Sequence, residues 1–328
     1  MKNMTTILKQ NSRIDQLDLT MCIIGSRKVG PEDQLYSQGW HVFAPNLRVI
    51  GFEPDQQACD VLNQEAASLS WVEEHFPLAL AETDGLVPFY ITRNPACSSL
   101  YKPNEPLLNR FKGLRDQVEL KKEDVLAVIS LDQFCDFYEI NKVDVIQLDV
   151  QGADLNILRG GLKTLTQVLS ITVEVEFSPL YEGQPLFADV DIFLRNQGFV
   201  LLDLWTKRVP KKSSPVEGIE HPGQLLWGDA FYFRDPLMCG KDSKYKSAES
   251  CLKLACIADV MGFVDYALEL FQHLTIMYGA ADSRYNFADE ITEALEQIPE
   301  LVGQGLLTFP IIQSIEPYMS SSCRERLR

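Results

Sequence analysis

The feature that most constrains the fold is an alternation of short apolar runs with segments of helical period. Each apolar run ends at a turn or a charged residue, and a helix-like segment follows most of them. This alternation predicts βα units around a mostly parallel sheet, and hence an α/β fold. The expected strands are 19–25, 47–54, 76–82, 143–150, 169–177, 199–208 and 228–234, and the expected helices are 55–69, 131–140, 153–166 and 188–198.

Two segments interrupt or follow this pattern. Residues 87–92 have strand composition, but the polar stretch after them, 93–125, has no firm period and is expected to be a lid or loop insert. After Pro236 the pattern becomes helical, with apolar residues at helical spacing over 247–274 and 282–298. We therefore expect an α/β domain over 14–236 and a helical C-terminal extension over 237–328.

Composition excludes several classes of function. The chain has 30 Lys and Arg against 46 Asp and Glu, a formal charge of -16, which disfavours nucleic-acid binding. Its eight cysteines include no C-x-x-C pair and it has only four histidines, so no metal site is predicted. The N-terminal residues lack an apolar signal segment, and no run of 18 apolar residues occurs. A cytoplasmic protein without a membrane span is expected.

Three polar features stand where predicted strands end. Gly25 closes the first strand in IIGSRKVG, Glu53 closes the second in GFEPD, and Asp149 closes a later one in VDVIQLDVQGADLNILRGG. In open α/β sheets ligands bind outside the carboxyl ends of the strands, so together the three indicate one site. The structural alternatives are an ordinary turn glycine, a surface glutamate before a helix-starting proline, and a helix cap.

A longer set of segments carries a family resemblance. The runs GFEPDQQACDVLN, LALAETDG, SLDQF, VDVIQLDVQGADLNILRGG and ITVEVEFSPLYEGQPLFADVDIFLRNQGFVLLDL, in this order and spacing, resemble the FkbM family of S-adenosylmethionine-dependent methyltransferases. The resemblance covers about residues 14–236. It implies the seven-stranded Rossmann-like sheet of class I methyltransferases, S-adenosylmethionine as cofactor, and methyl transfer to a hydroxyl of a sugar, glycan or glycosylated metabolite.

The resemblance also implies roles for individual residues around the cofactor. Gly25 and Ser26 would line its methionine part, Glu53 would bind the ribose diol, and Ala79 with Leu80 would flank the adenine. Asp149 would lie near the sulfonium and the incoming hydroxyl.

On the acceptor side the resemblance indicates Glu174 and Glu176. Their spacing puts both side chains on one face of a strand. Because a doubly ionised buried pair is costly, one of them is expected to have a raised pKa and to act as general base, with Asp149 as the other candidate. Tyr181, Trp227 and Asp229 border the same edge as candidate substrate contacts; the alternative is that they belong to the core or its rim.

The chain departs from the family pattern at four positions. Ile23 stands where the family usually has Asp, Val29 where it has Gly, and Gln147 and Gln151 where it has Lys and Glu. Two alternatives therefore stay open beside each other, an active methyltransferase and a degenerate binding module. A nicotinamide oxidoreductase, a third class, lacks its G-x-G-x-x-G motif here.

An open pocket between Gly25, Glu53 and Asp149 would support the active methyltransferase. If the side chains of Ile23, Arg27 or Lys28 filled this pocket, the degenerate binding module would be supported instead. Substrate loops are expected at 93–125 and 206–228, and a homo-oligomer through the C-terminal helices is a further expectation.

Overall fold

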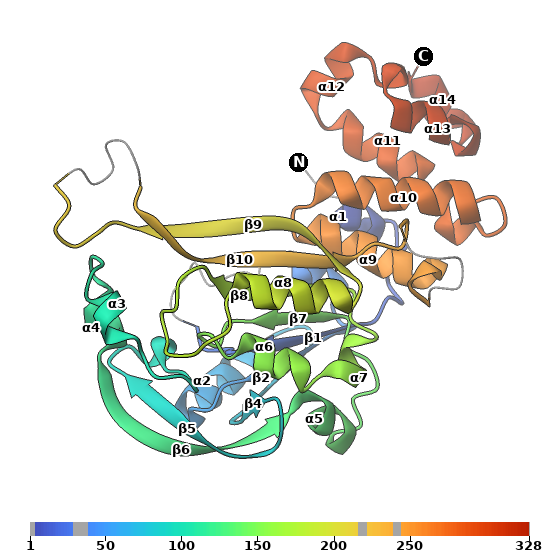
Figure 1. Cartoon of the computed structure of the whole chain (residues 1–328). Helices are drawn as coiled ribbons and strands as arrows, with labels where there is room; N and C mark the ends of the chain where they lie inside the picture. The colour runs from blue at the N-terminus through green and yellow to red at the C-terminus, as the bar shows by residue number, and fades with distance from the viewer. Residues whose placement is uncertain (1–3, 29–38, 216–221, 239–243, 328) are drawn as a thin grey trace. The chain divides into compact units, whose positions relative to one another are not determined.

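A seven-stranded sheet forms the centre of the larger unit. The computed structural model describes residues 4–28, 39–215, 222–238 and 244–327. The strand order is β3-β2-β1-β7-β8-β10-β9, and the part from β2 to β9 can be followed in Figure 1. β1, β7 and β8 run parallel, as do β2 and β3, whereas β10 is antiparallel to both of its neighbours. The predicted α/β class and seven-stranded sheet are confirmed. The bounds are β1 Leu19–Ile24, β2 Leu47–Phe52, β3 Val72–Phe76, β7 Val145–Leu148, β8 Ser170–Glu176, β9 Phe199–Val209 and β10 Gln224–Arg234.

A second, three-stranded sheet has the order β4-β6-β5, with β4 at Ala79–Ala81, β5 at Gly85–Thr92 and β6 at Leu120–Ser130. The expectation of one main-sheet strand over 76–82 was therefore wrong. The amide of Leu78 donates to the carbonyl of Phe76 (2.8 Å), so the chain turns after β3 and the next three residues pair with β6 instead.

The insert expected to be a loop over 93–125 also contains regular structure. It holds η2 (Pro95–Cys97), α3 (Glu105–Leu108), α4 (Leu114–Val118) and the first half of β6. Most side chains in β6 are exposed, so no buried alternation marks it in the sequence. β6 pairs antiparallel with β5 along the whole length of β5.

The helices of this unit follow the predicted order, with one correction. Besides α3 and α4, they are α2 (Gln56–Ala66), α5 (Leu131–Phe137), α6 (Asp154–Arg159), α7 (Leu162–Leu165) and α8 (Phe187–Asn196). The single helix expected over 153–166 is broken between α6 and α7 at Gly160 and Gly161. A Cβ on Gly160 would lie 2.4 Å from the carbonyl oxygen of Ala81, so the chain passes β4 too closely for a side chain. α6 and α8 both contact β8 (Figure 1).

Aromatic rings fill the core beside β2 and β3. The Phe134 ring of α5 packs edge-on against Phe52 and Phe76, with centroids 4.6 and 5.0 Å apart. All three side chains are buried. Edge-to-face pairs of this kind add to the free energy gained by burial, so they fix α5 against the sheet.

Of the described residues, 4–19, 39–47, 235–238 and 244–327 form the second compact unit. Its helices confirm the helical pattern expected after Pro236, and the Ser247 hydroxyl accepts the amide of Ser250 as the N-cap of α9. Residues 14–19 and 39–47 group with this unit rather than with the larger one, so the boundary at 236 stays a prediction. Among the described residues no helix is long and apolar enough to cross a bilayer. The described part of this unit contains the 3-10 helix η1 (Trp40–Phe43) and the α-helices α1 (Met4–Gln10), α9 (Ala248–Val260), α10 (Val264–Tyr278), α11 (Ala288–Glu296), α12 (Pro299–Gln304), α13 (Pro310–Ile315) and α14 (Ser321–Leu327).

Candidate functional site

The carboxyl ends of β1, β2 and β7 meet through backbone hydrogen bonds. The amide of Gly25 donates to the carbonyl of Phe52 (3.0 Å), and the amide of Asp149 donates to the carbonyl of Ile24 (3.0 Å). One residue beyond the end of β2, the amide of Glu53 donates to the carbonyl of Phe76 (3.1 Å). The three residues singled out in the sequence therefore lie at one edge of the sheet, as the parallel strand order requires.

Gly25 fills a position that no other residue fits without strain. Its φ is +83°, in the left-handed region, and a Cβ there would lie 2.0 Å from the carbonyl oxygen of Asp149. Glycine lets the two strand ends approach each other and leaves the edge open. Val29, where the family pattern has a second glycine, lies outside the described residues.

A cavity of about 350 Å³ opens at this edge. Its volume is within the usual range for small-molecule sites. The small sheet and the 95–100 segment form the opposite wall, through residues that include Phe89, Ile91, Ser98 and Ser99. Among the residues predicted to bind cofactor, Gly25, Glu53, Ala79, Leu80 and Asp149 line the cavity.

Ser26 does not line the cavity. Its side chain is buried, and its hydroxyl lies 2.9 Å from Nδ1 of His75, on β3. Nε2 of His75 in turn lies 3.1 Å from Glu73 Oε1. The imidazole fits because residue 51 is glycine: a Cβ on Gly51 would lie 2.0 Å from Nδ1 of His75. The Ser26 side chain thus ties the residues after β1 to β3.

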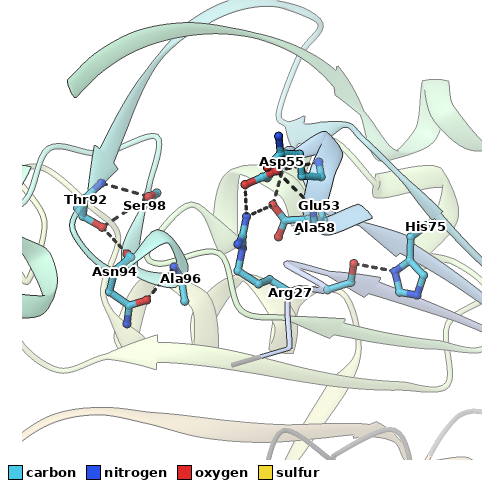
Figure 2. A network of polar contacts seen from close by, with 11 residues as sticks. Arg27, Glu53, Asp55, Ala58, His75, Thr92, Asn94, Ala96 and Ser98 are labelled. Atoms are coloured by element: carbon cyan, nitrogen blue, oxygen red, sulfur yellow. Dashed lines mark hydrogen bonds and ion pairs between the residues drawn. The ribbon is translucent and has the colours of Figure 1, made fainter. Parts of the chain in front are cut away.

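Glu53 is almost fully buried and is held in one orientation. Its Oε1 accepts the amide of Asp55 (2.8 Å) and lies 3.2 Å from Nη2 of Arg27 (Figure 2). Within the described part of the chain no donor bonds to Oε2, which leaves that oxygen for a ligand hydroxyl. Arg27 also donates to Asp55 Oδ2 (2.7 Å), and this bond is the main cause that lowers the pKa of Asp55.

Of the three side chains that were expected to fill a degenerate pocket, only Arg27 lines the cavity. Ile23 is buried within the sheet, and Lys28 pairs with Glu65 (2.9 Å). The cavity is therefore open between Gly25, Glu53 and Asp149, with one guanidinium group beside the Glu53 carboxylate.

Acidic side chains continue from this edge across the neighbouring strands. The antiparallel register of β8 and β10 puts Glu174 opposite Asp229 and Glu176 opposite Trp227. The four side chains share one face, as the spacing of the two glutamates predicts. Asp149 is exposed and Glu174 is partly exposed, whereas Glu176 is buried. Only Asp149 of these acidic residues lines the cavity.

Burial and mutual repulsion raise the pKa of several acidic groups here. Burial, followed by the charge of Asp149, raises the pKa of Glu174 well above its ordinary value. The same two causes raise the pKa of Asp229 to about 6 and that of Asp154, on α6, to about 7. Sequence reasoning missed Asp154, whose only signal is an acidic residue in the first turn of a helix.

Two of the predicted substrate contacts have buried or partly buried rings. The Tyr181 side chain is buried, and its hydroxyl lies 2.9 Å from both the Cys97 carbonyl oxygen and Gln151 Oε1. A ring buried to this degree offers no free face for a sugar, so stacking at Tyr181 is not supported. Trp227 is half-buried and does not line the cavity. Loop 206–228 includes residues 216–221, which lie outside the described residues.

Comparisons with known proteins identify the family of the chain. A family model described as the methyltransferase FkbM domain matches residues 35–201. The 2-O-methyltransferase NoeI of Sinorhizobium fredii is 26% identical over 151 residues, which are 45% of this chain and 62% of the relative. The match thus spans less than two thirds of that relative.

Solved structures resemble the chain more loosely. Methyltransferase FkbM from Methylobacillus flagellatus is 13% identical with a TM-score of 0.37, covering 66% of this chain and 43% of its own. The N-terminal domain of EvdMO1 with SAH bound is 8% identical with a TM-score of 0.31, covering 71% and 82%. Because the family model matches half of the chain, the chain belongs to the FkbM methyltransferase family.

Proposed function

We propose that this chain transfers a methyl group from S-adenosylmethionine to a hydroxyl of a sugar, glycan or glycosylated metabolite. The observation that carries the proposal is the open cavity bounded by Gly25, Glu53 and Asp149 at the carboxyl ends of β1, β2 and β7. The name of the relative NoeI, a 2-O-methyltransferase, supports a hydroxyl as the acceptor group.

The predicted cofactor class follows from the family, whose members are methyltransferases. The residues at the cavity fit S-adenosylmethionine in three respects. Gly25 lets a ligand approach the backbone, the free Oε2 of Glu53 suits a ribose hydroxyl, and Ala79 with Leu80 gives an apolar surface for a purine. When bound, the cofactor supplies an electrophilic methyl group on a sulfonium, whose C–S electrons stay with sulfur as the acceptor oxygen forms the new C–O bond.

The chain's own residues supply orientation and a proton acceptor. Glu53 is held from behind by Arg27 and by the Asp55 amide, so it is oriented before a ligand arrives. Asp149 lines the cavity, and Glu174 contacts Gln151, which also lines it; both are candidate bases for the hydroxyl proton. Orientation of donor and acceptor supplies much of the acceleration of such a transfer, and a general base adds about 10²- to 10⁴-fold.

Methyl transfer is tested with S-adenosylmethionine labelled in its methyl group and a panel of mono- and oligosaccharides. We expect label in an alkali-stable ether of a sugar hydroxyl, with turnover lowered about 10²-fold or more in Glu174→Gln. The exposed Glu182→Gln serves as the control with the same chemical change. Label in an amine or a carboxylate ester instead of an ether would overturn the assignment to O-methylation.

The binding-module alternative rests on Arg27. Its guanidinium group pairs with the carboxylate that is proposed to bind ribose. If this pair excludes the cofactor, the wild-type chain will not bind S-adenosylhomocysteine, and Arg27→Ala will restore binding. Binding by the wild type removes this alternative.

A further inference from the structure

The side chain of Gln151 joins two carboxyl groups of the acceptor side. Its Nε2 lies 2.7 Å from Asp149 Oδ1 and 2.8 Å from Glu174 Oε2. A primary amide nitrogen carries two hydrogens, so it donates to both oxygens at once. The opposite orientation of the amide would point a carbonyl oxygen at two carboxyl groups. Oε1 faces away from them, toward the Tyr181 hydroxyl (2.9 Å).

The backbone of Gln151 is fixed in an uncommon conformation. Its φ of +57° lies in the left-handed region, which few residues other than glycine adopt. The Ser99 hydroxyl, on the far wall of the cavity, donates to its carbonyl oxygen (2.7 Å). Strained backbone that the surroundings hold in place is concentrated at functional sites. The turn therefore fixes the amide between the end of β7 and β8.

One amide nitrogen that donates to an oxygen of each carboxyl group brings the two groups close together, and the charge of Asp149 raises the pKa of Glu174. Two carboxyl groups so placed do not readily ionise together, so the pair retains one proton. We propose that Gln151 is a positioning residue that holds Asp149 and Glu174 as one proton-sharing pair, and that this pair takes the hydroxyl proton of the methyl acceptor. The role of the pair as base rests on the proposed function, whereas the sharing of a proton does not.

Because the Gln151 side chain is neutral, it does not make the pair bind a second proton. The family pattern has Glu at this position, which would add a third carboxylate in contact with the other two. Burial, followed by the charge of Asp149, already raises the pKa of Glu174. The other titratable or charged groups whose fields act on the pair or its neighbours are Cys97, Asp154, Glu176, Tyr181, Lys207 and Asp229. A further negative charge would hold a second proton near neutral pH.

The test is a pH titration of the full chain, free of ligand, by NMR with ¹³C-labelled Asp and Glu side-chain carboxyls. Asp149→Asn and Glu174→Gln identify the two resonances. In the wild type we expect them to titrate together and to retain one proton above about pH 6, where isolated carboxyls are ionised. In Gln151→Glu, the pH at which the pair loses this proton should rise by about 1 to 3 units. In Gln151→Met, which removes the hydrogen-bond donors without adding charge, that pH should rise by less.

Gln117→Glu, on the exposed surface of α4 (Leu114–Val118), makes the same charge change as a control and should leave both resonances as in the wild type. Independent titration of the two groups below about pH 5, or equal curves for Gln151→Glu and wild type, would overturn the proposal. Because the protein carries no ligand in this titration, a failure to bind S-adenosylmethionine would count against the proposed function and not against the proton-sharing pair.

Discussion

The close approach at Gly25 makes a quantitative prediction for Gly25→Ala. An alanine here adopts a φ of +83°, which costs about 1–2 kcal/mol for a residue with a Cβ. Its Cβ would also lie 2.0 Å from a backbone oxygen, whereas ordinary contacts begin at about 3.4 Å. That oxygen belongs to Asp149, whose amide is bonded to Ile24, so neither strand end can move alone. Overpacking of this kind costs about 1–3 kcal/mol more.

Gly113→Ala separates the two contributions. Gly113 has a similar φ of +77°, but nothing lies within 4 Å of the position that an alanine Cβ would take, so only the backbone cost applies. We therefore expect Gly25→Ala to melt about 2–12 °C below Gly113→Ala, from a difference of about 1–3 kcal/mol. Differential scanning calorimetry gives both Tm values. If the two variants melt together, β1 and β7 do not approach as closely as the structure indicates.

Two other substitutions test the placement of single side chains. Ser26→Ala should lower Tm by about 2–4 °C, because the hydrogen bond to His75 is lost. Its Kd for S-adenosylhomocysteine, measured by calorimetry, should stay within about twofold of the wild-type value. A large loss of affinity would instead place the hydroxyl in the cavity. For Asp154 the pKa rises from 3.8 to about 7 on folding, so the native state holds a proton that the unfolded chain releases, and the free energy of unfolding falls as pH rises across that interval. Urea midpoints at about pH 4.5 and 7.5 should therefore differ less in Asp154→Asn than in the wild type, and an equal difference would contradict the raised pKa.

The parts of the fold that local pattern determines were predictable. Buried parallel strands such as β7 are short apolar runs, and their carboxyl ends converge at one edge, so Gly25, Glu53 and Asp149 could be grouped from the sequence. The β4-β6-β5 sheet could not be predicted in this way. β6 is mostly exposed and owes its conformation to pairing with β5, a long-range contact that hydrophobic period does not reveal.

Side-chain direction at the site was also beyond the sequence. Ser26 follows Gly25 at the predicted turn, yet its hydroxyl points toward His75 because Gly51 leaves space for that imidazole. Arg27 was one of three side chains that would have filled the pocket of a binding module, but it holds one oxygen of Glu53 and leaves the other free. Gln151 was visible only as a departure from the family pattern, and its bonds to Asp149 and Glu174 depend on its left-handed φ.

The central claim is that Glu53, at the end of β2, binds the cofactor. Isothermal titration of the wild type, Glu53→Ala and Glu74→Ala with S-adenosylmethionine and S-adenosylhomocysteine tests it most directly; Glu74 is an exposed glutamate on β3 and serves as the control. We expect the wild type and Glu74→Ala to bind both compounds with similar affinity. Glu53→Ala should weaken binding by at least about tenfold, the loss of one hydrogen bond to a charged group. Equal affinity of all three proteins, or no binding by the wild type, would contradict the account.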